Sequence, residues 1–360
     1  MYSFILWNVS PEFFSIGSFS LRWYGLLFAM GFLLGQQLLI WMFKKEGRNQ
    51  RDVESITIYM LIGTIIGARL GHCLFYEPEY FLKHPLEILY IWQGGLASHG
   101  ATLGIVISLY LYSRKHKDQS FIYIADRVVI CVALGASLIR LGNVMNSEII
   151  GKPTDAPTAF LFMHGIEENI TPVMGNLVER ITLTQIDSAF VFGDKTVQPV
   201  EVTLHMSALG NGDIKDVLEY GVKEALTNSY DYQEEKFLLP EQLKFSESTN
   251  EQGKKTVLFK VYGVARHPAQ LYESITMFVL FALLLSMYVK HQGNLPTGRT
   301  LGWFMVITFT LRFSYELIKV NQVSFEDSMD FNMGQILSIP LILIGLYILL
   351  KSYRGKKEIS

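Results

Sequence analysis

Long apolar runs alternate with short polar connections over most of this 360-residue chain. A helix needs roughly 20 predominantly apolar residues to cross the hydrocarbon core of a bilayer. Seven runs approach or reach that length, and they cover residues 21–43, 53–75, 98–113, 121–142, 269–290, 300–319 and 333–351. The pattern predicts an all-α polytopic membrane protein with about seven transmembrane helices.

One long polar segment, 152–266, interrupts this pattern between the fourth and fifth predicted helices. Three stretches in it alternate as strands do, "ITLTQIDSAFVF", "VQPVEVTLHM" and "KTVLFKVYGV", and "GDIKDVLEYGVKEALTN" has helical spacing. These features predict an inserted α+β domain. The chain then divides into a membrane part at 1–151 with helices one to four, the inserted domain at 152–266, and a membrane part at 267–360 with helices five to seven.

Composition and charge narrow the class further. Half of the residues are hydrophobic and 18% are charged, whereas soluble domains have about a quarter charged residues. A net charge of −2 argues against binding nucleic acid through bulk electrostatics. We therefore expect membrane lipids, and no nucleic acid, among the partners.

Lysine and arginine gather in the connections on one predicted side of the membrane. The segments "KKEGRNQR", "SRKHKDQ", "KHQGNLPTGR" and the C-terminal "KSYRGKKE" are basic, whereas "EPEYFLKHPLEILYIWQGG" and "NQVSFEDSMDFN" contain a single Lys between them. Basic short loops stay in the cytoplasm. We expect an extracytoplasmic N-terminus and inserted domain, and a cytoplasmic C-terminus. The N-terminal residues lack the pattern of a cleavable signal peptide, and Trp7, Phe13 and Phe14 are expected at the membrane interface.

Several ionisable side chains fall inside or at the ends of the predicted spans. A charged side chain near the bilayer centre costs about 2.5–3.5 kcal/mol on insertion scales, so such residues are usually functional. The orientation above puts one polar set near the outer leaflet, with two arginines somewhat deeper: His99, Asn143, Asn146, Glu148, Gln270 and Glu273, then Arg140 and Arg312. Arginine binds phosphate with paired hydrogen bonds. The set predicts a site for an anionic lipid headgroup.

Structural roles stay open for some of these residues. Arg312 and Glu316 are four residues apart and can form an ion pair on their own helix, and Arg69 can bridge two helices. His99 differs, because "GGLASHGA" surrounds the imidazole with small residues that clear space around it.

Five blocks in order resemble the motifs of the prolipoprotein diacylglyceryl transferase family. They are "LRWYGLLFAMGFLLG" with Tyr24, "GARLGHCLFYEPEYFLKHPLEILYIWQGGLASHG" with Arg69 and His99, "RLGNVMNSEIIGKPTD" with Arg140, Asn143, Asn146, Glu148 and Gly151, "RHPAQLYE" with Gln270, Tyr272 and Glu273, and the sixth-helix pair Arg312 and Glu316. Three positions depart from the family pattern. Lys152 replaces an Arg, Ser98 replaces a Phe, and Thr308 replaces a Tyr.

The resemblance implies a reaction at the bacterial cytoplasmic (inner) membrane. The diacylglyceryl group of phosphatidylglycerol would move to the thiol of a lipobox cysteine in a secreted prolipoprotein, without a cofactor or metal. The nucleophile would belong to the substrate, since Cys73 and Cys131 fall in apolar spans, where a thiol is inert. The resemblance implies catalytic roles for His99, Arg140, Glu273 and Arg312. It implies substrate binding by Tyr24, Arg69, Asn143, Asn146, Glu148, Gly151, Gln270, Tyr272 and Glu316.

Two other classes remain as alternatives. Helices with intramembrane charges also suit a membrane transporter, and an outer-leaflet headgroup site also suits a lipid-binding receptor. The polar groups gather near one leaflet instead of the midplane, and the sequence has no internal repeat of the kind found in many transporters. The transferase hypothesis is therefore preferred.

Overall fold

A computed structural model gives the fold of the chain and describes residues 4–17, 19–91, 94–95, 97–211, 214–228, 235–249, 254–320, 326 and 328–354. The chain forms two compact units. The first, here the mixed unit, comprises Met1–Leu27, Ile139–Ile275 and Arg312–Ile336. The second, here the helical unit, comprises Phe28–Leu138, Thr276–Leu311 and Leu337–Ser360.

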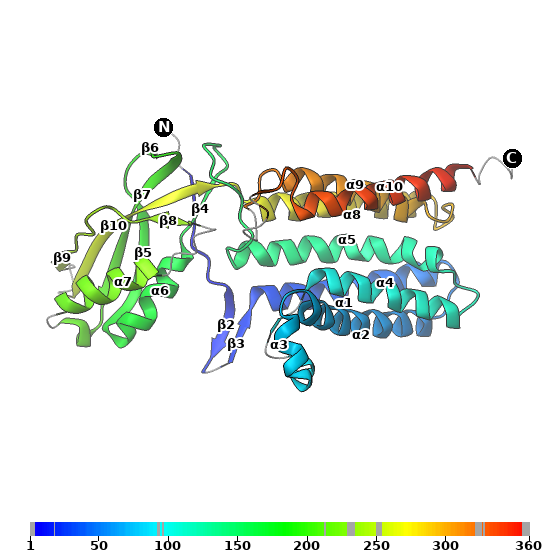
Figure 1. Cartoon of the computed structure of the whole chain (residues 1–360), viewed down its shortest axis with the longest axis horizontal. Coiled ribbons are helices and arrows are strands. Elements are labelled where there is room, and N and C mark those ends of the chain that lie inside the picture. Colours follow the sequence, from blue (N-terminus) through cyan, green and yellow to red (C-terminus); the bar gives the residue numbers. More distant parts are fainter. Residues whose placement is uncertain are drawn as a thin grey trace. The chain divides into compact units, whose positions relative to one another are not determined.

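The helical unit is built from long apolar helices that run lengthwise beside one another (Figure 1). They are α1 (Trp23–Lys45), α2 (Gln50–Phe75), α4 (Ser98–Lys115), α5 (Phe121–Met145), α8 (Ala269–Lys290), α9 (Arg299–Tyr315) and α10 (Met333–Arg354), with the short α3 (Pro78–Lys83) and the 3-10 helix η1 (Pro85–Leu89) after α2. Large apolar side chains also cover the outside of these helices; Leu33 and Leu74, for example, are 61% and 63% exposed. Such a surface is expected where helices face lipid.

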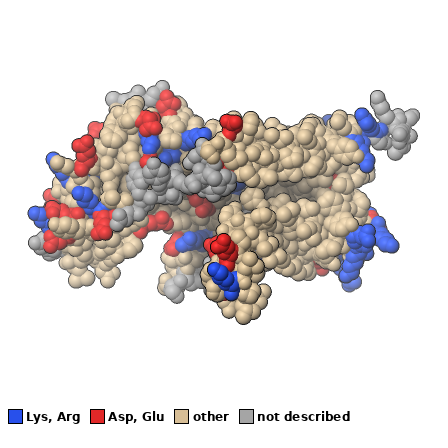
Figure 2. Space-filling model, in the orientation of Figure 1, with Lys and Arg blue, Asp and Glu red and all other residues tan. Residues whose placement is uncertain are grey.

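Charged side chains are sparse along the middle of the long helices in the helical unit. Figure 2 shows a broad face of the helices with few charged side chains, and lysine and arginine at their far end. The last turns of four helices are basic: α1 with Lys44 and Lys45, α4 with Arg114 and Lys115, α8 with Lys290, and α10 with Lys351 and Arg354. This distribution fits helices whose apolar middle lies in a bilayer.

Glycines allow α2 and α4 to pack with their backbones in close approach. A Cβ atom added at Gly67 would lie 2.2 Å from the carbonyl oxygen of Gly100, and one at Gly104 would lie 2.0 Å from that of Gly63. No larger residue fits where the two backbones approach this closely. Gly63, Gly67 and Gly71 recur every four residues in α2, and small residues at this spacing favour such close helix packing.

The mixed unit contains an eight-stranded sheet whose main path runs β1-β4-β10-β7-β5. The strands are β1 (Ile5–Trp7), β4 (Phe160–Phe162), β5 (Val178–Gln185), β6 (Phe190–Phe192), β7 (Lys195–Met206), β8 (Phe237–Leu238), β9 (Ser246–Thr249) and β10 (Lys255–Arg266). β1 is parallel to β4, and β10 pairs antiparallel with β4, β7, β8 and β9. The two long strands, β7 and β10, therefore form the centre of the sheet.

Helices cover this sheet and complete its core. They are α6 (His164–Met174), the 3-10 helices η3 (Gly175–Leu177) and η4 (Ala208–Asn211), the π-helix η5 (Val217–Val222) and α7 (Lys223–Asn228). Buried residues of α6 and η5, including Ile166, Ile170 and Leu218, join Val202 and Phe259 of the sheet in one apolar cluster. Alternation along β7 and β10 produces this inner face.

The N-terminal residues form strands before the first long helix. β2 (Glu12–Ile16) and β3 (Phe19–Arg22) make a separate two-stranded sheet that leads directly into α1. Phe13 and Phe14 are each 51% exposed on it. Trp7 instead packs against Phe160 and donates a hydrogen bond from Nε1 to the Val144 carbonyl at 3.0 Å. Of the three aromatic residues expected at the interface, Trp7 is thus half-buried against the sheet.

The predicted fold class, all-α with about seven transmembrane helices, is wrong. Among the described residues five helices are long and apolar enough to cross a membrane: α1, α2, α5, α8 and α10. The helices in the third and sixth predicted runs, with 18 and 17 residues, are at the short end for a span and are not among these five. The N-terminal strand β1 lies outside the inserted segment. It forms because its backbone can hydrogen-bond to β4, which lies much further along the chain.

Candidate active site

The last turn of α5 and the turn after it bring four predicted site residues together. Arg140 Nη1 donates to Asn143 Oδ1 at 3.2 Å. Asn143 Nδ2 in turn donates to Glu148 Oε1 at 2.7 Å, and Asn146 Nδ2 donates to the same oxygen at 3.2 Å. The Glu148 carboxylate therefore orients both carboxamides, one of which faces the Arg140 guanidinium.

The backbone on either side of Glu148 is strained. Ser147 and Ile149 have φ angles of 52° and 58°, in the left-handed region that residues other than glycine rarely adopt, and a β-branched residue such as Ile149 least of all. Backbone bonds hold the turn: Ser147 N–H donates to Val144 O and Glu148 N–H to Asn143 O, each at 3.1 Å. Strain of this kind, maintained by its surroundings, is typical of functional sites.

Arg140 begins a series of alternating charges. Its Nε lies 2.5 Å from Glu273 Oε2, at the start of α8. The other oxygen of Glu273 pairs with the Lys319 ammonium, whose Nζ is 3.8 Å from Glu316 Oε1. Arg312 Nη2 is 3.7 Å from the same Glu316 oxygen. These five residues, Arg140, Glu273, Lys319, Glu316 and Arg312, are the ion-pair chain, and all of them belong to the mixed unit.

The two arginines at the ends of the ion-pair chain are its most accessible members. The side chains of Arg312 and Arg140 are 36% and 23% exposed, whereas that of Lys319 is 5% exposed. The contact described for the Arg312 guanidinium is to Glu316 at 3.7 Å, and those described for Arg140 involve its Nε and Nη1. Both guanidiniums therefore keep N–H donors for an anion, which they can bind with the paired geometry of an arginine fork.

The backbone at Gly151 packs closely against the segment that contains Lys319. Gly151 and Lys319 form an isolated antiparallel bridge, and Gly151 N–H donates to His267 O at 2.9 Å. A Cβ atom at Gly151 would lie 2.6 Å from the His267 Cβ and 3.0 Å from the Ile318 carbonyl oxygen. Burial lowers the pKa of the His267 imidazole beside Gly151, although Asp155 opposes this shift. The structure thus gives Gly151 a packing role.

The first turn of α8 also contains Gln270 and Tyr272. Gln270 is fully buried, and neither its Oε1 nor its Nε2 has a hydrogen-bond partner among the residues that the structure describes. Unpaired buried carboxamides are rare, because each polar atom loses its bonds to water. Tyr272 OH is 3.3 Å from Thr158 Oγ1. Tyr24, at the start of α1, packs against Gly142, where an added Cβ would lie 3.0 Å from its ring.

Two further predicted residues, Arg69 and His99, lie in the helical unit. Arg69 is 5% exposed and donates to the carbonyl oxygens of Glu87, Ile88 and Gly94 at 2.6, 2.9 and 2.7 Å. Its guanidinium therefore links α2 to the connection between α2 and α4. His99 lies in the first turn of α4 with its side chain exposed.

Comparison with known proteins decides the family. A family model described as prolipoprotein diacylglyceryl transferase matches residues 11–351. The chain belongs to the prolipoprotein diacylglyceryl transferase family. This match confirms the resemblance drawn from the five sequence blocks and makes the protein a transferase. With its five candidate spans it is a multi-pass membrane enzyme.

Individual relatives agree over nearly the full length. The phosphatidylglycerol–prolipoprotein diacylglyceryl transferase of Chloroherpeton thalassium is 34% identical, over 98% of this chain and 96% of the relative. Those of Tolumonas auensis and Bacteroides fragilis are each 32% identical over 98% of this chain, and 99% and 96% of the relatives are covered.

The sequence analysis of this transferase missed two features of the site. Lys319, the centre of the ion-pair chain, was not among the predicted residues, although its position three residues after Glu316 was a signal. Arg140 also has no carboxylate at helical spacing within its own apolar run. Its partner, Glu273, comes from α8.

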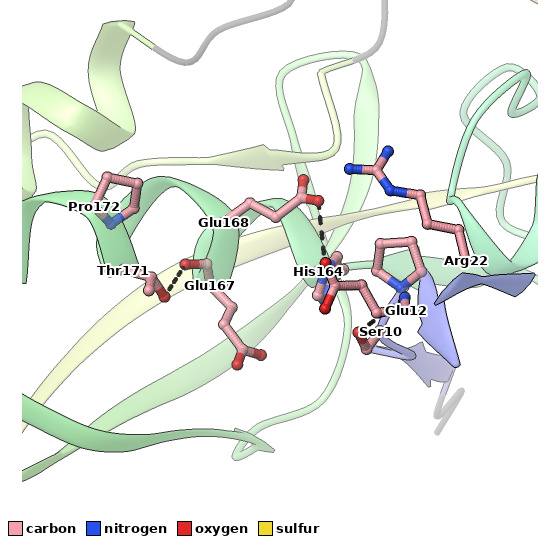
Figure 3. Close-up of a pocket in the computed structure, with 9 residues that line it drawn as sticks. Ser10, Glu12, Arg22, His164, Glu167, Glu168, Thr171 and Pro172 are labelled. Carbon is pink, nitrogen blue, oxygen red and sulfur yellow. Dashed lines mark hydrogen bonds and ion pairs between the residues drawn. The ribbon is translucent and has the colours of Figure 1, made fainter. Parts of the chain in front are cut away.

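The transferase also has a hollow of about 370 Å³ away from the predicted residues. Figure 3 shows it between the N-terminal strands, with Glu12 and Arg22, and α6, with His164, Glu167 and Glu168. His164 Nε2 lies 3.5 Å from Glu168 Oε1. Three glutamates and a single arginine line this hollow, so its charge disfavours an anionic headgroup.

Proposed function

We propose that this transferase moves the diacylglyceryl group of phosphatidylglycerol to the thiol of a lipobox cysteine in a secreted prolipoprotein. The names of the relatives give the lipid and the class of acceptor. The observation that supports the proposal most strongly is the ion-pair chain, because its two partly exposed ends are guanidiniums with N–H donors to spare. Phosphate is the part of the lipid that such groups bind.

The chemistry requires a sulfur nucleophile and a phosphate leaving group. The S–C bond to the glyceryl carbon forms as the C–O bond to phosphate breaks, and the electron pair of that bond stays on the phosphate oxygen. The thiol proton passes to a base, and glycerol 1-phosphate leaves with one more negative charge than the headgroup phosphate had. Arg140 and Arg312 stabilise the charge as it develops.

The base and the nucleophile come from different molecules in this proposal. His99 is the proposed base, because imidazole accepts protons near neutral pH and its side chain is exposed at the first turn of α4. The sulfur belongs to the prolipoprotein, since both cysteines of the chain are buried.

The polar groups around the ion-pair chain are proposed to bind the rest of the lipid and the acceptor. Gln270 supports this assignment, since its buried carboxamide has both donors and acceptors to offer. Glu148 fixes the carboxamides of Asn143 and Asn146. Tyr24 and Tyr272 add hydroxyl groups that suit the glycerol headgroup.

We further propose the orientation of the transferase in the bacterial cytoplasmic membrane. The N-terminus and the inserted domain at 152–266 are extracytoplasmic, where secreted prolipoproteins emerge, and the C-terminus is cytoplasmic. This sidedness requires the shorter helices α4 and α9 to cross the membrane together with the five candidate spans. Basic last turns on α1, α4, α8 and α10 support this assignment.

A transfer assay with purified protein tests the proposed function. Acyl-labelled phosphatidylglycerol and a lipobox peptide should yield a lipid thioether and an equal amount of glycerol 1-phosphate. The same peptide with Ser in place of its Cys is the control and should gain no label. A folded protein that moves no label to the Cys peptide would contradict the proposal and favour a carrier or receptor.

A further inference from the structure

Lys319 is fixed in place by the backbone on both sides. Its N–H donates to Tyr315 O at 3.1 Å, and its segment bridges to Gly151. The neighbouring Ile318 carbonyl accepts a hydrogen bond from Lys152 N–H at 2.7 Å. The side chain is 5% exposed, so water competes little with the carboxylates for the Lys319 ammonium.

The ammonium lies between the two carboxylates that bind the arginines. It pairs with Glu273 Oε1, while Glu273 Oε2 binds Arg140 Nε at 2.5 Å. It is 3.8 Å from Glu316 Oε1, which is 3.7 Å from Arg312 Nη2. Each carboxylate thus has Lys319 on one side and an arginine on the other.

Counting charges shows what Lys319 contributes. The ion-pair chain has three cations and two carboxylates, a net charge of +1. A phosphodiester with one negative charge would bring the sum to zero. Without Lys319 the same five positions would already be neutral, and the phosphate would add an uncompensated charge in a poorly solvated site.

We propose that Lys319 is a positioning residue that keeps Glu273 and Glu316 compensated while Arg140 and Arg312 turn their donors to the substrate phosphate. The inference rests on the function proposed above and deepens it. A phosphate bound to Arg140 competes with Glu273 for the charge of that guanidinium, and Lys319 keeps the Glu273 carboxylate compensated. Lysine suits this place because its ammonium is a compact charge with three donors, able to contact two carboxylates at once.

Charge-balancing variants test the role of Lys319. Lys319→Gln should lower kcat/KM for phosphatidylglycerol about 100-fold, mainly by raising KM. The double variant Lys319→Gln with Glu316→Gln restores the net charge of +1 and should recover at least about tenfold over the single variant. Lys195→Gln is the matched control, because Lys195 is an ion-paired lysine of the inserted domain, bound to Glu235, and should leave transfer unchanged.

Each outcome decides the inference. Folded Lys319→Gln enzyme within threefold of wild-type kcat/KM would overturn it, as would a double variant no more active than the single one. If Lys319→Gln does not fold, the double variant decides, since it leaves no unpaired carboxylate from Glu316. A folded double variant with less than about one-hundredth of wild-type activity would then overturn the inference. Failure of the wild-type protein to transfer would instead contradict the proposed function.

Discussion

At the scale of single residues, the positions of arginine and lysine in the ion-pair chain match the different hydrogen-bonding geometries of the two side chains. Arginines occupy the exposed ends, where a planar fork can bind two phosphate oxygens, and a lysine occupies the buried centre. Glu316 receives a further hydrogen bond from Asn332 Nδ2 at 3.1 Å. The pair between Arg312 and Glu316 is therefore one contact in a larger network, and at 3.7 Å it is a loose one.

Gly151 provides a residue-scale prediction. Gly151→Ala should destabilise the protein by about 1–3 kcal/mol and reduce transfer, because the new Cβ would meet His267 and the Ile318 carbonyl and displace the Lys319 segment. Gly165→Ala in α6 is the control, since an added Cβ there has no described atom within 4 Å. Thermal unfolding and transfer rates measure both effects. Equal stability and activity in the two variants would show that Gly151 has no packing role.

Four of the five residues of the ion-pair chain could be singled out from the sequence, but most of their pairing could not. Arg140, Glu273, Arg312 and Glu316 were recognisable as costly charges in or beside apolar runs. Spacing revealed a partner only for Arg312 and Glu316, which share a helix. The pairing of Glu273 with Arg140 joins α8 to α5, and tertiary packing alone determines it. Lys319 follows the end of a helix and looks like an ordinary loop lysine until its burial is known.

At the scale of elements, periodicity was informative wherever an element was long. The quoted "VQPVEVTLHM" and "KTVLFKVYGV" fall in β7 and β10. The three-residue strand β1 and the short strands β2 and β3 are too short to show alternation in the sequence. β1 is stabilised by its distant partner β4, and β2 and β3 by pairing with each other. The helices in the third and sixth apolar runs are only 18 and 17 residues long, and hydropathy did not reveal this because it does not show where a helix begins or ends.

The contact between α2 and α4 gives a prediction at this scale. Gly67→Ala should lower the thermal unfolding midpoint in detergent, because its Cβ would lie 2.2 Å from the Gly100 carbonyl oxygen and force the helices apart. The cost should be about 1–3 kcal/mol. Gly135→Ala in α5 has no described atom within 4 Å of the new Cβ and serves as the control. A midpoint for Gly67→Ala equal to that of the control would argue against close backbone packing.

At the scale of the whole molecule, the orientation in the membrane determines which leaflet supplies the lipid. Cys73 and Cys131 are buried, so an added cysteine should dominate labelling by an impermeant maleimide in intact cells. Ser248→Cys in the inserted domain should react, and Lys117→Cys in the connection after α4 should react only after lysis. Both residues are exposed in the structure. Labelling in the opposite sense would reverse the proposed topology.

The central claim for the whole enzyme is that Arg140 binds the phosphate of the lipid. Arg140→Gln should fold and insert, because Glu273 keeps Lys319 as its partner, yet it should lose at least about 100-fold in transfer. Arg140→Lys retains the charge without the fork and should keep part of the activity. The most direct measurement is diacylglyceryl transfer from labelled phosphatidylglycerol per folded molecule for wild type, Arg140→Lys and Arg140→Gln. Activity falling in that order is the predicted result, and wild-type turnover by folded Arg140→Gln enzyme would contradict it.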